Sequence, residues 1–155
     1  MRPPRVDQIN VVLAQVDAAA DFLAGLGVDM PAPPPGWESH HRSVPVALSP
    51  LGVDDLGEPP VAIELDSAPF AQRWGGLPPS FAGVVLNVRV DERDEVDRLH
   101  GVALSLGATS LARPYDAFWG SRFAIVEGPG PLVVGLLSVP DEDRRSAPPD
   151  PSSLV

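Results

Sequence analysis

The sequence predicts an α+β protein made of two tandem βαβββ modules that form a curved, partly open barrel. Three observations lead to this class. The chain has 155 residues, of which 44% are hydrophobic, and this is enough for the core of one domain. Its 14 glycines and 20 prolines indicate many turns between short elements. Apolar segments of strand and helix length follow one another in the same order in both halves of the chain.

The first half opens with a strand at residues 9–14, a compact apolar run rich in β-branched side chains. A helix at residues 18–26 follows, with Asp17 as the expected N-cap and Gly27 as the C-terminal stop. Three further extended segments complete this half: residues 28–35, 40–48 and 61–65. A short helix at residues 67–74 and a linker at residues 75–80 connect it to the second half.

The second half repeats this order. A strand at residues 84–90 precedes a helix that Asp91 is expected to cap and Gly107 to end. Four apolar residues recur on this helix at helical spacing: Val96, Leu99, Ala103 and Leu106. Three more strands follow, at residues 108–113, 122–126 and 132–138.

A repeat of this length indicates a duplicated module, and two curved sheets meeting in pseudo-symmetry would enclose a cup lined by alternate strand residues. We therefore expect a single domain at residues 1–139, with module one at 6–67, a linker helix at 68–80, module two at 81–139, and a loosely held, proline-rich tail at 140–155.

Composition excludes several classes of function. The chain has no cysteine, which excludes disulfides, zinc–thiolate sites, iron–sulfur clusters and thiol nucleophiles. Its formal net charge of -10 disfavours nucleic acid as a partner, because phosphate backbones would be repelled. No apolar run approaches the length of a membrane helix, and the first four residues do not resemble a signal peptide, so we expect a soluble cytoplasmic protein.

Three segments resemble the vicinal oxygen chelate superfamily, which includes glyoxalase I, extradiol dioxygenases and bleomycin-resistance proteins. INVVLAQ at residues 9–15, followed by AAADF at 18–22, resembles the opening strand and helix of that family. YDAFWGSRFAIV at residues 115–126 and GPGPLVVGLLS at 128–138 resemble its last two strands. The family's acidic DPDG turn is replaced here by Gly-Pro-Gly-Pro. The resemblance covers roughly residues 8–139 and implies the glyoxalase/bleomycin-resistance/dioxygenase fold.

The resemblance also implies positions for a metal site, since each module of a metal-using member supplies one ligand from its first strand and one from its last. Those positions fall at Gln8 and Glu64 in module one, and at Val84 and Gly135 in module two. Neither residue of module two has a side chain that binds a metal, and two oxygen ligands are too few to hold a transition metal. We therefore expect no metal and no other cofactor.

The histidines are the remaining candidate ligands. His40 and His41 are adjacent on an expected strand, so their side chains point to opposite faces and only one of them can enter the cup. That one would lie beside Gln8 and Glu64, the only route to a three-ligand metal site, although either histidine could also lie at the surface. His100, on the acidic helix, is expected to face solvent.

Four aromatic residues lie in segments that enter the third strand of each module, where the pockets of the family open: Trp37, Tyr115, Phe118 and Trp119. They could line a pocket for a flat or hydrophobic ligand, or the tryptophans could close the ends of the barrel as core. Arg122 could attract an anionic ligand or pair with a surface carboxylate. Asn10, on the first strand with Gln8, completes the candidate ligand-binding set.

These features predict a protein that binds a small, aromatic or hydrophobic molecule in a cup that lacks the family metal. The alternative is a metal-dependent lyase or dioxygenase of the same superfamily, in which Glu64 would be the catalytic base. In either case a homodimer is expected, with no nucleic-acid or membrane partner.

Overall fold

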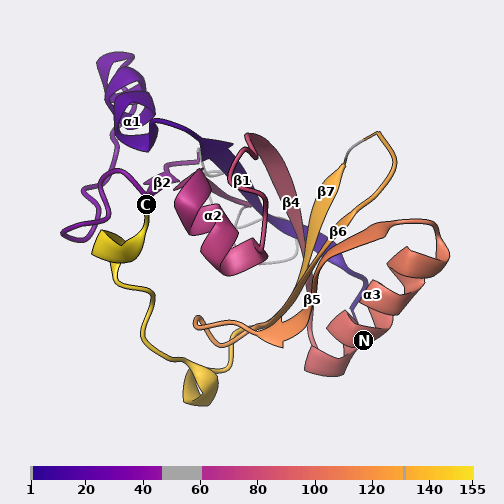
Figure 1. The fold of residues 1–155 in the computed structure, drawn as a ribbon. Helices are drawn as coiled ribbons and strands as arrows, with labels where there is room; N and C mark the ends of the chain where they lie inside the picture. Colours follow the sequence, from indigo (N-terminus) through magenta and orange to yellow (C-terminus); the bar gives the residue numbers. More distant parts are fainter. Residues whose placement is uncertain (1, 47–60, 131) are drawn as a thin grey trace.

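The computed structural model describes residues 2–46, 61–130 and 132–155, and these residues form one twisted, open sheet with three α-helices (Figure 1). The strand order is β2-β3-β1-β4-β7-β6-β5. The sheet does not close into a barrel, so the α+β class and curved sheet of the prediction are confirmed in their open form.

Module one supplies three strands and a helix. Their bounds are β1 (Arg5–Leu13), α1 (Val16–Gly25), β2 (His41–Val44) and β3 (Ala62–Ser67). β1 and β3 are parallel, and β2 is antiparallel to β3. After α2 (Ala68–Gly75), module two supplies β4 (Gly83–Val90), α3 (Arg93–Ser105), β5 (Thr109–Asp116), β6 (Arg122–Glu127) and β7 (Val133–Ser138).

The two modules join edge to edge through β1 and β4, which run antiparallel and place Gln8 opposite Asn87. Each central strand also has a parallel neighbour from its own module, and the registers match: Asn10 lies opposite Glu64 just as Asn87 lies opposite Gly135. This matched register relates the central strands of the two halves by an internal structural repeat. The two first strands therefore meet at the middle of the sheet and form the floor of the concave face.

The larger core cluster lies on the concave face. Phe70, Ala71 and Trp74 of α2 pack against Val85 and Phe123 of the sheet, and all five are buried. Ser67 precedes α2 as its N-cap, and its hydroxyl accepts a hydrogen bond from the backbone N–H of Phe70. A smaller cluster lies under α3 on the other face, where Val96 meets Ala124 and Leu136. Alternate residues of β6 and β7 thus serve opposite faces, as strand geometry requires.

Module one departs from the predicted pattern in its third segment. Residues 28–35 form no strand, because Pro31 and three consecutive prolines at 33–35 lack the backbone N–H that a ladder needs. The strand expected at residues 40–48 is shorter: β2 ends at Val44, and positions 47–48 lie outside the described residues. The helix caps also differ, since Gln15 precedes α1 and Glu92 precedes α3, in place of Asp17 and Asp91.

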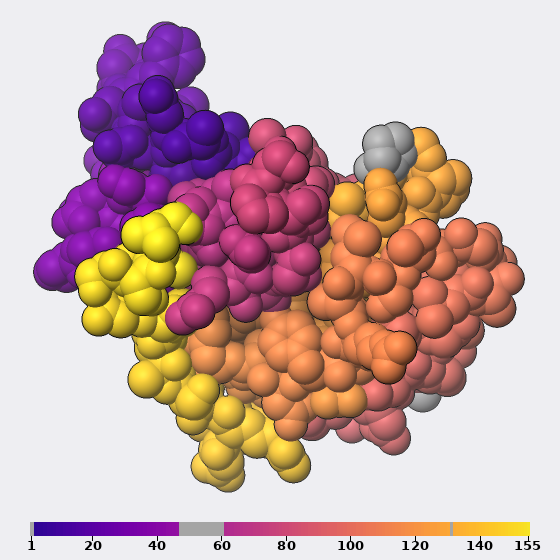
Figure 2. Space-filling view, viewed as in Figure 1, coloured from indigo at the N-terminus to yellow at the C-terminus, as the bar shows by residue number. Residues whose placement is uncertain are grey.

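The tail at residues 140–155, expected to be loosely held, contacts the body at several points, although most of its residues are exposed. The backbone N–H of Asp141 donates to Gly120 O, and that of Ser146 donates to Phe118 O. Leu154 is buried in the concave-face cluster, and Pro151 lies against Gly36. The tail therefore runs from module two back over module one, as the yellow segment in Figure 2 shows.

In the part of the chain that the structure describes, no helix has the length and apolar character needed to cross a membrane.

Candidate functional site

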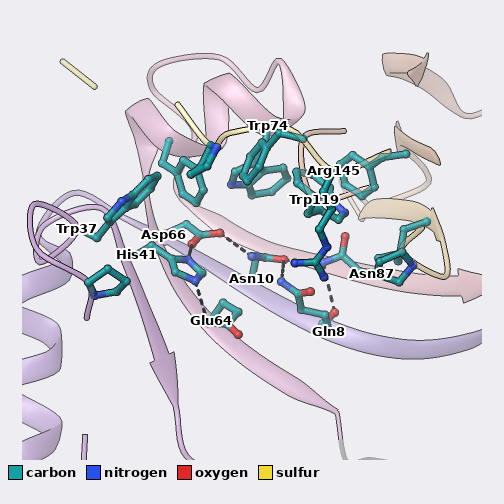
Figure 3. A pocket seen from close by; sticks show the side chains of 17 residues that line it. Gln8, Asn10, Trp37, His41, Glu64, Asp66, Trp74, Asn87, Trp119 and Arg145 are labelled. Carbon is teal, nitrogen blue, oxygen red and sulfur yellow. Dashed lines mark hydrogen bonds and ion pairs between the residues drawn. The ribbon is translucent and has the colours of Figure 1, made fainter. Parts of the chain in front are cut away.

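A cavity of about 630 Å³ opens on the concave face of the sheet (Figure 3). Its floor is made by β1, β3 and β4, and its walls by α2, β6, β7, the segment before β2 and the loop after β5. The tail supplies one rim through Pro140, Arg145 and Pro148. This volume lies within the range typical of small-molecule sites, roughly 300–1,000 Å³.

The centre of the floor is a network of side-chain amides. Asn10 donates through Nδ2 to Asp66 Oδ2 at 2.5 Å and accepts through Oδ1 from Asn87 Nδ2 at 2.6 Å. Gln8 Nε2 donates to the same Oδ1 of Asn10 at 3.1 Å. Asn10 lies on β1 and Asn87 on β4, and both are buried. Their hydrogen bond therefore holds the two central strands of the floor in a fixed arrangement where the modules meet.

One end of the floor carries an imidazole between two carboxylates. Nδ1 of His41 lies 2.5 Å from Asp66 Oδ1, and its Nε2 lies 3.4 Å from Glu64 Oε2. Asp66 is only 1% exposed, and its second oxygen accepts from Asn10. Glu64 accepts a 2.8 Å hydrogen bond from the hydroxyl of Ser43. The alternation of β3 places Glu64 and Asp66 on the same face, two residues apart.

These neighbours shift two pKa values. Burial lowers the pKa of His41, but the hydrogen bond to Asp66 and the charges of Asp66 and Glu64 outweigh it, so the net pKa lies above the ordinary 6.5. Burial raises the pKa of Glu64 above its ordinary value, against the opposing effects of the Ser43 hydrogen bond and of His41. The imidazole is thus held toward its cationic form beside a carboxyl group that is partly desolvated.

Aromatic side chains make the walls. Six of the residues that line the cavity are aromatic: Trp37, Phe70, Trp74, Phe118, Trp119 and Phe123. Neighbouring rings meet edge to face, with centroids 4.9 Å apart for Trp37 and Phe70 and 5.0 Å apart for Phe118 and Trp119. The wall of module one therefore continues around the cavity into that of module two.

The structure brings most of the predicted site residues together. Seven of the ten line the cavity: Gln8, Asn10, Trp37, His41, Glu64, Phe118 and Trp119. Between the adjacent histidines, His41 faces the cavity, whereas Nδ1 of His40 bonds Ser67 Oγ at 2.9 Å at the start of α2. The prediction that only one of them enters the cup agrees with this arrangement.

Besides His40, two predicted residues lie outside the cavity lining. The phenol O–H of Tyr115 donates to the backbone O of Trp74 in α2, and burial raises the pKa of this phenol. Arg122 pairs with Asp97 at 2.8 Å and Asp116 at 3.1 Å on the outer surface, which is the surface pairing considered as its alternative. Another expectation also fails, since His100 is buried and its Nε2 lies 2.8 Å from Ser110 Oγ.

Ten lining residues were not predicted from the sequence. Six of them are aromatic, charged or amide side chains: Asp66, Phe70, Trp74, Asn87, Phe123 and Arg145. Two of them had a readable signal, because Asp66 alternates with Glu64 on β3 and Phe123 follows the predicted aromatic segment. Arg145 had none, since nothing local to the tail indicates that it returns across the cavity.

The metal-ligand position that the resemblance implied at Val84, in the first strand of module two, is one residue away from the true counterpart of Gln8. The matched pairs of the two modules make Asn87 the counterpart of Asn10, so Val85 is the counterpart of Gln8. Val84 instead points to the other face and is 48% exposed. The side chain at the corrected position is again an isopropyl group, buried in the core.

The second ligand position of module two is Gly135 on β7, and the side chain of Asn87 on the neighbouring strand β4 occupies the space beside it. A Cβ at Gly135 would overlap the side-chain amide of Asn87, so this glycine is required by the close approach of Asn87. Gln8 and Glu64 are then the only metal-binding side chains at the four positions. His41 does not complete a set, because its two nitrogens face two different carboxylates and do not converge on one point.

Among the described residues, no three His, Cys, Asp or Glu side chains are placed to hold a metal ion. The residues at these positions therefore do not fit the family-type centre, which needs at least three convergent ligands.

Solved structures share the fold at low sequence identity. A glyoxalase/bleomycin resistance protein/dioxygenase superfamily member from Vibrio splendidus is 12% identical, over 88% of this chain and 100% of that one, with a TM-score of 0.51. A Streptomyces coelicolor methylmalonyl-CoA epimerase in complex with 2-nitronate-propionyl-CoA is 19% identical, over 93% of this chain and 98% of that one, with a TM-score of 0.52.

The Mn(II)-bound glyoxalase from Novosphingobium aromaticivorans is 16% identical, over 88% of this chain and 40% of that one, with a TM-score of 0.53. No protein-family model and no curated protein matches the sequence. These similarities establish the fold alone.

Proposed function

We propose that this chain, which has the glyoxalase/bleomycin resistance/dioxygenase fold, binds a small, flat, aromatic or hydrophobic molecule in the concave-face cavity without the family metal. The observation that carries the proposal is the cavity of about 630 Å³ with six aromatic residues in its walls. Aromatic rings give a flat ligand a large apolar contact area, and burial of that area drives binding.

The polar groups support specific recognition. The amides of Gln8, Asn10 and Asn87 offer hydrogen-bonding groups at the floor, and His41 and Glu64 offer ionisable ones at its end. A mostly apolar pocket with a few fixed polar groups is typical of ligand sites. Because the floor is held by its own hydrogen bonds, it needs little reorganisation when a ligand enters.

A thermal-shift screen tests this function. Aromatic compounds are added to protein that was purified without chelator, with and without divalent metals, and the metal content of the protein is measured. The proposal expects aromatic compounds to raise the melting temperature equally in both conditions. Stoichiometric zinc, nickel or iron in the protein, or stabilisation that requires an added metal, would instead favour the alternative function, a metal-dependent lyase or dioxygenase in which Glu64 is the catalytic base.

We also propose that the chain forms a homodimer and works in the cytoplasm. Phe22 and Leu26 are 67% and 68% exposed at α1, which stands at one end of the sheet in Figure 1 and offers an apolar surface for a second copy. Sedimentation equilibrium at micromolar concentration should give twice the chain mass. In a Phe22→Glu/Leu26→Glu variant, the measured mass should fall toward that of one chain.

A further inference from the structure

Four of the residues that line the cavity can carry charge: His41, Glu64, Asp66 and Arg145. Asp66 is compensated, because one of its oxygens is paired with His41 at 2.5 Å and the other accepts from Asn10. Arg145 is half exposed at the rim, and its Nε lies 3.0 Å from Oε2 of Glu142.

Glu64 is the least compensated of the four. Its hydrogen-bond donor is the neutral hydroxyl of Ser43, and the nearest cation, His41 Nε2, is 3.4 Å away, longer than the roughly 2.7–2.9 Å of a close charge-assisted bond. Desolvation raises the pKa of this carboxyl group, as expected for an acid without a full counter-charge. Glu64 is therefore the negative group of the cavity without a close counter-charge, most of all when His41 is neutral.

The wall next to this carboxyl group is aromatic. Phe70 lies 5.6 Å from His41 and 4.9 Å from Trp37, centroid to centroid, with all three rings edge to face. Ring faces attract cations through their quadrupole, and the attraction is stronger where water is displaced. Figure 3 shows Trp37, His41 and Glu64 at the same end of the cavity. The formal net charge of -10 of the whole chain acts in the same direction.

We propose that the ligand of this cavity is a planar aromatic cation, whose positive group lies at Glu64 and whose ring lies against the wall formed by Trp37 and Phe70. This inference rests on the proposed function and specifies the chemistry of its ligand. A neutral ligand of the same shape gains only the apolar contact, whereas an anion is opposed by Glu64.

His41 makes the affinity depend on pH. The charged and titratable groups that face its ring are Asp66 and Glu64, both from β3; Trp37 and Phe70 contact it from the preceding loop and from α2. A protonated His41 competes with the ligand for Glu64, and protonation of Glu64 also removes the attraction. Affinity for a cation of fixed charge therefore rises with pH, and both groups act in the same sense.

Three bicyclic probes of similar shape test the charge preference: N-methylquinolinium, which is cationic at every pH, the neutral methylnaphthalene, and the anionic naphthoate. Dissociation constants are measured by equilibrium dialysis. At about pH 8 the cation should bind at least about tenfold more tightly than the neutral probe, and the anion most weakly. For the cation, affinity should fall several-fold between about pH 8 and about pH 5.5, whereas the neutral probe should show little change.

Two variants locate the effect. Glu64→Gln keeps the shape of the side chain and should reduce the cation preference to about twofold or less. Glu127→Gln, at the end of β6 and outside the cavity, changes the net charge equally and should keep the preference. The pH profile of the unmodified chain gives the same test without a substitution.

Equal affinity for cation and neutral probe, or a preference that survives Glu64→Gln, would overturn this inference and leave the proposed function standing. Failure of all three probes to bind would contradict the proposed function itself, and the inference with it.

Discussion

At the scale of single residues, the site depends on one exchange between two strands. Where the fold's metal-using form would place a ligand on the last strand of module two, this chain has Gly135, and the amide of Asn87 fills the space that a side chain would need. Asn87 then bonds Asn10, its counterpart in module one. The contact between the two asparagines, which lie on β1 and β4, could not be predicted from the sequence, because it depends on the register of these strands.

The close approach of Asn87 predicts the effect of a single methyl group. Gly135→Ala should destabilise the protein by about 1–3 kcal/mol, since the new Cβ would force the Asn87 amide from its position. Urea unfolding measures the change.

Gly25→Ala is the matched control, because a Cβ at the end of α1 meets no described atom within 4 Å. It should be neutral, or stabilising by up to about 1 kcal/mol. Equal effects of the two substitutions would show that Asn87 does not occupy the space beside Gly135.

His41 predicts a pH-dependent contribution to stability. Its pKa is raised in the folded state, so the stability it contributes is fully present below about pH 6.5 and is lost as pH rises through the folded value. Glu64, whose pKa is also raised, loses stability as pH rises above its unfolded value, which is the same direction. The difference in unfolding free energy between the unmodified chain and His41→Gln should therefore shrink as pH rises.

Urea unfolding at a series of pH values measures this difference. In a Glu64→Gln background the dependence on pH should be weaker, because one of the two carboxylates that act on His41 has gone. A difference that is constant across the range, or one that grows with pH, would contradict the interpretation of the His41 contacts.

At the scale of elements, local patterns predicted most of the fold. Local sequence patterns located the seven strands and three α-helices of the described residues to within about four residues, and Gly27 and Gly107 adopt the positive φ expected after a helix. Periodicity failed for residues 28–35, where prolines were compatible with an extended chain but not with a paired one. The contact of Leu154 with the body has no local signal in the sequence, because its burial depends on distant residues of the concave-face cluster.

The docking of the tail can be measured through Leu154. Leu154→Ala should destabilise the protein by about 2 kcal/mol, near the low end for a buried leucine because the chain end can adjust. Leu106→Ala, at a side chain that is 81% exposed, should change stability by less than about 0.5 kcal/mol.

Hydrogen exchange tests whether the contact of Leu154 with the core helps to hold the rest of the tail in place. Leu154→Ala should raise the exchange rate of the Ser146 amide, which bonds Phe118 O at the rim of the cavity. An unchanged rate at Ser146 would show that the tail is held independently of its last residues.

At the scale of the whole molecule, duplication explains why the site lies where it does. The two first strands meet at the middle of the sheet, so the floor is made of paired positions from both modules. The repeated order of elements in the sequence predicted this arrangement, and seven of the ten candidate residues line the cavity. The lining residues of α2 and the tail could not be predicted, because these segments reach the cavity through three-dimensional packing and not through the repeat.

The most direct test of the central claim is the position of a bound aromatic ligand relative to the tryptophans. All three tryptophans of the chain, Trp37, Trp74 and Trp119, line the cavity. Acrylamide quenching of tryptophan fluorescence is measured with and without a saturating aromatic compound, in variants that retain only Trp37 or only Trp119, the others being replaced by phenylalanine. We predict that the compound shields the remaining tryptophan in both variants. A compound that stabilises the protein but leaves the quenching of both tryptophans unchanged would be bound elsewhere, and would contradict the assignment of this cavity as the ligand site.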